Sequence, residues 1–159
     1  MTTAPRYAGG LVALVTALVA RQAGAQAPEF RNPAAMPPAK GYTQVVQVPA
    51  GHRLIFLSGQ VPLDSTGALR GGSDFRAQAR QVFDNLRAGL AAAGASFDDV
   101  IKLNFYVLDV ANLPALREVR DRYVNTAAPP ASTLVQVSRL FRDDVLLEVE
   151  AIAAIGEAR

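Results

Sequence analysis

Two glutamates near the C-terminus have the spacing of a carboxylate pair on one strand. Glu148 and Glu150 alternate with apolar residues in the segment 147–151. Both side chains are therefore expected on the same face of a strand, about 6.5–7 Å apart. Two carboxylates at that separation could act in acid–base catalysis. A solvated or subunit-contacting face with paired charges is the more ordinary explanation, and the spacing alone favours it.

A serine and a glycine at the end of a predicted strand form a second candidate. Ser58 is followed by Gly59, and a small hydroxyl beside a flexible glycine can present backbone N–H groups to a ligand oxygen. A turn without a ligand is the commoner explanation. His52 is the only histidine and the chain has no cysteine, so neither a metal site nor a cofactor is predicted. The chain also lacks the G-x-S-x-G motif and the glycine-rich loops that bind phosphates.

The strands that would carry these residues are predicted from alternation and from turn residues. They span 42–48, 53–58, 100–108, 131–137 and 145–153. Gly51 separates the first two, which are predicted to form a hairpin. The segment 26–40 is rich in proline and alanine and is predicted to be an irregular lead-in.

Two helices are predicted between these strands. The first begins at Ser73 or Asp74 and ends before Gly94. Its apolar residues recur at helical spacing and form one stripe, Phe75, Ala79, Val82, Phe83, Leu86 and Leu90. The second helix begins near Asn112. The order of elements predicts an α+β fold, in which two helices pack on one face of a mixed sheet and self-association covers the other face.

The N-terminal segment differs from the rest of the chain. Residues 1–25 contain two arginines, no acidic residue and a short apolar run, 11–20, followed by the small residues Ala23-Gly24-Ala25. This pattern is typical of a secretory signal peptide cleaved after Ala25. The alternative is a membrane anchor, but the apolar run is shorter than the roughly 20 residues that cross a bilayer. The mature protein is expected to be periplasmic or secreted, without a membrane attachment.

Composition and charge argue against a nucleic-acid partner. The 159 residues are 50% hydrophobic and 19% charged, as in an ordinary globular domain. The formal net charge of +2 falls to zero once the two arginines of the leader are removed. No cluster of lysine and arginine is present that would bind a phosphate backbone.

Six segments between about Asn32 and Ala153 resemble the RidA (YjgF/UK114) family in order and spacing. They are residues 41–44, 58–64, 81–86, 92–94, 130–133 and 148–153. The resemblance implies a RidA-like domain over 41–155 with a chorismate-mutase-like α+β fold. It also implies a homotrimer that binds small molecules in clefts between subunits. Members of the best-known type hydrolyse 2-imino acids, or their enamine tautomers, to 2-keto acids and ammonia.

The resemblance assigns roles to four of the residues of this chain. Tyr42 and Ser58 match residues that line the cleft, and Gly59 matches a backbone donor. Glu148 matches the carboxylate that positions the attacking water.

Three other positions depart from the deaminase pattern. Ser132 stands where the deaminases have an arginine, Leu134 replaces a cysteine of the cleft, and Arg117 takes the position of an asparagine on the second helix. An arginine binds a carboxylate through two charge-assisted hydrogen bonds, each worth roughly 1.5–3 kcal/mol. Loss of this arginine would therefore weaken binding by about two to four powers of ten.

The sequence predicts a Rid-type hydrolase of an imine or enamine whose substrate need not carry a carboxylate. Arg117 could replace the missing arginine if it reaches the cleft, although the charged run 117–122 is typical of a solvent-facing helix. Arg139 is a poorer substitute, because an unbroken strand would place it on the face opposite Ser132. The alternative is a non-catalytic trimer that binds a small molecule or a protein. RNA cleavage is disfavoured by the neutral charge.

Overall fold

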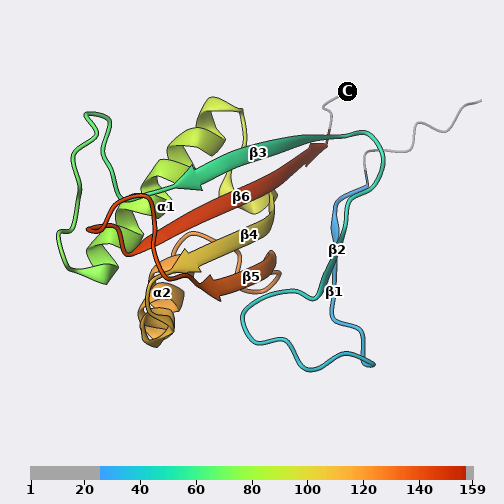
Figure 1. Ribbon diagram of the computed structural model, residues 1–159. Coiled ribbons are helices and arrows are strands. Elements are labelled where there is room, and N and C mark those ends of the chain that lie inside the picture. Colours follow the sequence, from blue (N-terminus) through green and yellow to red (C-terminus); the bar gives the residue numbers. More distant parts are fainter. Residues whose placement is uncertain (1–25, 157–159) are drawn as a thin grey trace, which may run out of the picture.

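A computed structural model describes residues 26–156 and contains a four-stranded mixed sheet (Figure 1). The strand order is β3 (His52–Gln60), β6 (Leu147–Gly156), β4 (Val100–Val107) and β5 (Ala131–Gln136). β6 is antiparallel to both of its neighbours, whereas β4 and β5 are parallel. The predicted signal peptide and its cleavage site lie outside the described residues.

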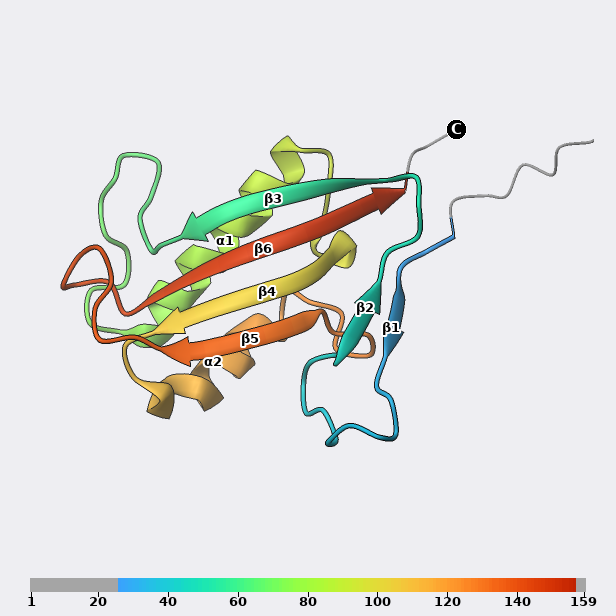
Figure 2. The ribbon, with the colours of Figure 1, turned by 45° about the vertical axis from the view of Figure 1, so that its right-hand side comes forward.

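Both helices lie on the same side of this sheet, as Figure 2 shows. α1 (Phe75–Ala92) packs against β3 and β6 and contacts α2 (Leu113–Arg120). Short 3-10 turns, Phe97–Asp99 and Val110–Asn112, precede β4 and α2. The predicted α+β class is therefore confirmed. None of the helices within residues 26–156 is both long and apolar enough to span a bilayer.

The local sequence explains where α1 begins and ends. The Asp74 carboxylate accepts hydrogen bonds from the backbone N–H groups of Arg76 and Ala77 and so caps the helix. Gly94 has a φ of +73°, a left-handed conformation that stops the helix with little strain. All six apolar residues of the predicted stripe are buried in the core between the helix and the sheet.

The predicted hairpin is wrong, because β2 (Val45–Gln47) does not pair with β3. It pairs instead with β1 (Glu29–Arg31), which lies in the segment predicted to be irregular. Pro28 and Pro33 flank β1 without entering it, so neither proline removes a hydrogen bond from the ladder. β3 pairs with the long strand β6 because that pairing brings their apolar residues together over the core.

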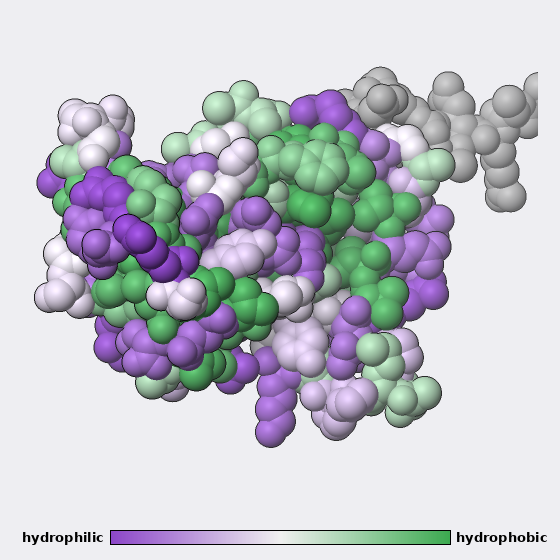
Figure 3. Space-filling model, in the orientation of Figure 1, coloured by the Kyte–Doolittle hydropathy of each residue, from purple (hydrophilic) through white to green (hydrophobic). Residues whose placement is uncertain are grey.

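The face of the sheet opposite the helices, here called the open face, has no covering layer within residues 26–156. Its side chains come from all four strands, namely Leu54, Phe56, Lys102, Asn104, Tyr106, Thr133, Val135, Glu148, Glu150 and Ile152. Phe56 is 71% exposed and Leu54 is 47% exposed. In Figure 3 hydrophobic surface gathers over β3 and β6, beside hydrophilic surface over the middle of the sheet.

Candidate functional site

The residues predicted to form the site lie on two opposite faces of the sheet. Ser132 and Leu134 are the cross-strand partners of Leu103 and Phe105, whose side chains are buried on the helix side. Glu148 is the partner of Tyr106 on the open face. Cross-strand partners point to the same face of a sheet. Within one chain, Ser132 and Glu148 therefore lie on opposite faces, separated by the thickness of the sheet.

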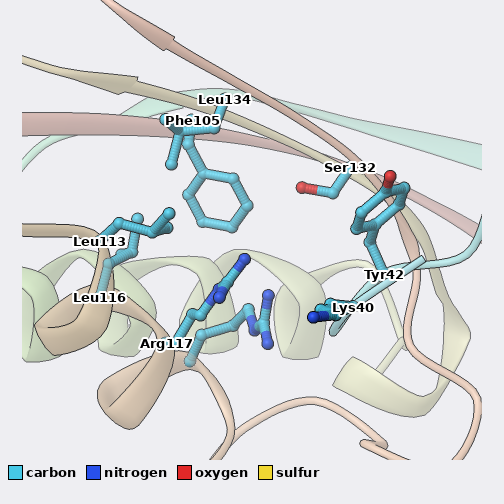
Figure 4. A pocket seen from close by; sticks show the side chains of 9 residues that line it. Lys40, Tyr42, Phe105, Leu113, Leu116, Arg117, Ser132 and Leu134 are labelled. Atoms are coloured by element: carbon cyan, nitrogen blue, oxygen red, sulfur yellow. The ribbon is translucent and has the colours of Figure 1, made fainter. Parts of the chain in front are cut away.

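The residues on the helix side meet at one pocket of about 250 Å³. This helix-side pocket is lined by Lys40, Tyr42, Phe105, Leu113, Leu116, Arg117, Arg120, Ser132 and Leu134. In Figure 4, Tyr42 lies beside Ser132, and Phe105 projects toward the same space from the sheet. The structure thus brings together four of the predicted residues, Tyr42, Arg117, Ser132 and Leu134.

A buried threonine positions Tyr42 at this pocket. The Thr43 hydroxyl donates to the carbonyl oxygen of Pro129 at 2.6 Å. The backbone N–H of Thr43 donates to the carbonyl oxygen of Pro130 at 3.2 Å. Thr43 also forms a parallel bridge with Ala131, the first residue of β5. These contacts fix residue 42 next to the start of β5, where Ser132 lies.

Three cationic side chains surround the pocket, and no acidic side chain lines it. Arg120 is buried, and its guanidinium donates to the Asp121 carboxylate through Nε at 2.8 Å and Nη2 at 2.6 Å. Arg117 and Lys40 form no salt bridge within the part of the chain that the structure describes. The pocket is therefore electropositive, and two of its cations are free to bind an anion.

Lys40 and Arg120 were missed by the sequence analysis. Arg120 follows Arg117 by three residues, so helical geometry already places the two side chains on one face. Lys40 lies in the irregular lead-in, where no pattern in the sequence relates it to β5. The next residue, Gly41, has a φ of +77°, and a Cβ atom there would come within 2.9 Å of Arg120 Nη2, so glycine allows the backbone to pass close to the pocket.

On the open face, Gly59 and Glu148 are in direct contact. A Cβ atom built on Gly59 would lie 1.7 Å from Glu148 Oε1, so the carboxylate occupies the space that a side chain would fill. The register between β3 and β6 shifts between Leu57 and Gln60, which brings Gly59 over Glu148. Burial, and to a smaller extent the charge of Glu150, raises the pKa of Glu148. A carboxyl group with a raised pKa is suited to proton transfer near neutral pH.

The two glutamates differ in their hydrogen bonds. Glu150 Oε2 accepts from Asn104 Nδ2 at 3.1 Å and from the Tyr106 hydroxyl at 3.2 Å. Burial and the hydrogen bond to Glu150 raise the pKa of the Tyr106 hydroxyl. The Glu148 carboxylate forms no side-chain hydrogen bond with any other residue of 26–156. Glu148 is thus the carboxylate that is free to act on a ligand, and Glu150 holds the neighbouring polar groups.

Two hollows flank this pair on the open face. Glu148 lines one of about 310 Å³ together with Tyr106, Arg139 and Phe141. Ser58 lines another of about 250 Å³ together with Asn104 and Glu150. β5 ends at Gln136, so Arg139 lies in the loop that follows the strand, and it lines this hollow on the face opposite Ser132. It forms an exposed salt bridge with Asp143 at 3.2 Å.

The described residues contain no cluster of three or more histidine, cysteine, aspartate or glutamate side chains that could hold a metal ion. His52 Nδ1 lies 3.0 Å from the carbonyl oxygen of Pro49, which explains the histidine without a ligand.

Comparison with known proteins places the whole fold in one family. A family model described as Endoribonuclease L-PSP matches residues 32–155. The protein DfrA of Myxococcus xanthus is 44% identical over 112 residues, which cover 70% of this chain and 83% of that protein. A reactive intermediate deaminase by name, TdcF of Escherichia coli K12, is 37% identical over 103 residues, covering 63% of this chain and 78% of TdcF.

A solved structure of a Rid-family protein, YyfB from Yersinia pestis, superposes with a TM-score of 0.75 at 34% identity. The match covers 80% of this chain and 98% of that protein, which is described as a protein of unknown function. The sequence, the mixed sheet with both helices on one face, and these relatives lead to one assignment. The chain belongs to the RidA/YjgF family.

Proposed function

We propose that this protein hydrolyses the C=N bond of small imines or enamines in a site shared by two copies of the chain. The helix-side pocket of one copy would hold the substrate, and Glu148 of a neighbouring copy would act on water. The main support is the position of Ser132 and Glu148 on opposite faces of one sheet. A homotrimer, as the family resemblance implies, would bring the open face of one copy against the pocket of the next.

The proposed reaction follows from the free carboxylate. The substrate reacts as the N-protonated iminium: Glu148 takes a proton from water as the water oxygen bonds to the imine carbon, and the C=N electron pair returns to the nitrogen to give a carbinolamine. Glu148 then gives this proton to the amino group, ammonia leaves as the C–N bond breaks, and the hydroxyl proton passes to solvent as the ketone forms. Ser58 and the backbone N–H of Gly59, adjacent to Glu148, would orient the substrate or the water. General acid–base catalysis of this kind is worth about 10²–10⁴ in rate.

The relative TdcF, which is named a reactive intermediate deaminase, supports the reaction class. Ser132 limits how far the analogy extends, because its short neutral hydroxyl cannot form the bidentate contact of an arginine. The proposal is therefore a C=N hydrolase whose binding of the substrate differs from that of the arginine-containing deaminases.

The test is release of 2-keto acid by the purified protein from an imine that an amino-acid oxidase generates in situ. The parent is compared with spontaneous hydrolysis and with Glu148→Gln and Ser132→Arg. We expect the parent to accelerate hydrolysis and Glu148→Gln to lose at least 100-fold of that activity. If the parent and Ser132→Arg are both inert, the protein is a binding module and the hydrolase proposal is wrong.

A further inference from the structure

We infer that Arg117, assisted by Lys40, binds the carboxylate of the substrate, and that the pocket selects 2-imino acids with an apolar side chain. This inference rests on the proposed function, since it names the substrate class of the same site. It assigns the task of the missing arginine to the opposite wall of the pocket, on α2.

The two ends of the pocket differ in chemistry. In Figure 4, Lys40, Tyr42 and Ser132 lie at one end, whereas Phe105, Leu113, Leu116 and Leu134 lie at the other, with Arg117 reaching between them. A ligand that fits both ends has an anionic or polar group at one end and a hydrocarbon group at the other. A volume of about 250 Å³ suits a small metabolite and is below the usual range of drug-sized sites.

The guanidinium of Arg117 forms no salt bridge with any of the described residues, unlike those of the neighbouring arginines. Arg76 and Arg122 both form salt bridges with Glu118, on the outer side of α2. The charge of Arg120 is matched by Asp121. Within residues 26–156, Arg117 is thus the cation of α2 that can give its full guanidinium to a ligand.

Serine at position 132 makes this arrangement possible. An arginine there would extend from β5 into the pocket and would repel the guanidinium of Arg117. With Ser132, the space is open, and the hydroxyl groups of Ser132 and Tyr42 remain as neutral hydrogen-bond partners. The planar guanidinium of Arg117 can then bind a carboxylate through two parallel hydrogen bonds.

The apolar end sets the expected dependence on the side chain of the ligand. Burial of one methylene group is worth a factor of about four in affinity. α-Ketoisocaproate, the product of the imine derived from leucine, has three more carbon atoms in its side chain than pyruvate does. We expect it to bind at least tenfold tighter, which allows for incomplete burial.

Equilibrium binding to a chain that begins at residue 26 tests the inference apart from catalysis. The probes are α-ketoisocaproate, pyruvate and methyl isobutyl ketone, which has the same hydrocarbon group without the carboxylate. Arg117→Gln is compared with Arg122→Gln, a matched control that removes an exposed arginine just beyond α2. Because both side chains are at the surface, thermal unfolding should show both variants to be folded.

We expect Arg117→Gln to weaken α-ketoisocaproate binding by about 10–100-fold and to leave the binding of the ketone unchanged. Arg122→Gln should bind all three probes as the parent does. Equal binding of α-ketoisocaproate by Arg117→Gln and the parent would overturn the inference. It would also be overturned if the parent bound pyruvate more tightly than α-ketoisocaproate, or bound neither. Binding that depends on Arg117 without any hydrolysis would support the inference and refute the hydrolase.

Discussion

Replacement of Gly59 by alanine should lower the stability of the protein only slightly but its activity strongly. The added Cβ atom would lie 1.7 Å from Oε1, 2.6 Å from Cδ and 2.9 Å from Cγ of Glu148. These distances are too short for any packing, so the glutamate must rotate away. The φ of Gly59 is not positive, and alanine can therefore adopt the same backbone conformation.

The expected size of each effect follows from this geometry. Overpacking of a rigid site costs about 1–3 kcal/mol, but a glutamate on a half-buried face can move, so we expect about 1 kcal/mol. That corresponds to about 4 °C in the unfolding temperature of a domain of this size. Under the proposed mechanism, a displacement of the Glu148 carboxylate by 1 Å or more is expected to lower kcat by about 100-fold.

A double-mutant cycle measures whether the contact causes these effects. Thermal unfolding is recorded for Gly59→Ala, Glu148→Ala and the double variant, and keto-acid release for the parent and Gly59→Ala. In the Glu148→Ala background, Gly59→Ala should no longer destabilise the protein, because the atoms that it meets are gone. Full activity of Gly59→Ala, or the same loss of stability in both backgrounds, would refute the reasoning.

Three further perturbations test other parts of the structure. Burial and, to a smaller extent, the charge of Glu150 raise the pKa of Glu148, so the acid limb of the kcat/KM profile should lie above 4.5. The limb should move to lower pH in Glu150→Gln, and an unmoved limb would contradict this. The buried Gln78 bonds three backbone groups, so Gln78→Leu should lower stability by about 3 kcal/mol, or about 10 °C in thermal unfolding, and a change below 2 °C would contradict this. Hydrogen bonds from Thr66 and Ala68 lower the pKa of Asp64 from 3.8 to about 2. The ionised form of Asp64 therefore stabilises the fold above pH 4, and this contribution is lost as the pH falls toward 2. Asp64→Asn should unfold at a lower temperature than the parent at pH 7, with a difference that shrinks below pH 4; a difference independent of pH would contradict the assignment.

The sequence was most informative where apolar residues repeat. The α1 stripe and the alternation along 147–151 predicted which residues face the core, and they placed Glu148 on the other face. The same argument fails for β5, because apolar residues occur on both of its faces, at Leu134 and at Val135. The face on which Ser132 lies depends on the parallel pairing with β4, which only the tertiary structure defines.

Contacts between distant segments account for most of what the sequence did not predict. The pairing of β1 with β2 involves three residues on each strand, too few to leave a pattern among the surrounding prolines. Lys40 reaches the helix-side pocket because Thr43 bonds Pro129, 86 residues further along the chain. No local property of residues 40–43 indicates that contact.

A complementation experiment tests the shared site most directly. Glu148→Gln removes the carboxylate of the open face, and Ser132→Phe fills the helix-side pocket; each variant alone should be inactive. When the two are co-expressed with different tags and purified through both tags as mixed trimers, one of the three sites in each trimer combines an intact pocket with an intact Glu148. A site shared by two copies predicts recovery of about one third of the parental rate of keto-acid release. Mixed oligomers that stay inactive while the parent is active would show that each chain contains its own complete site.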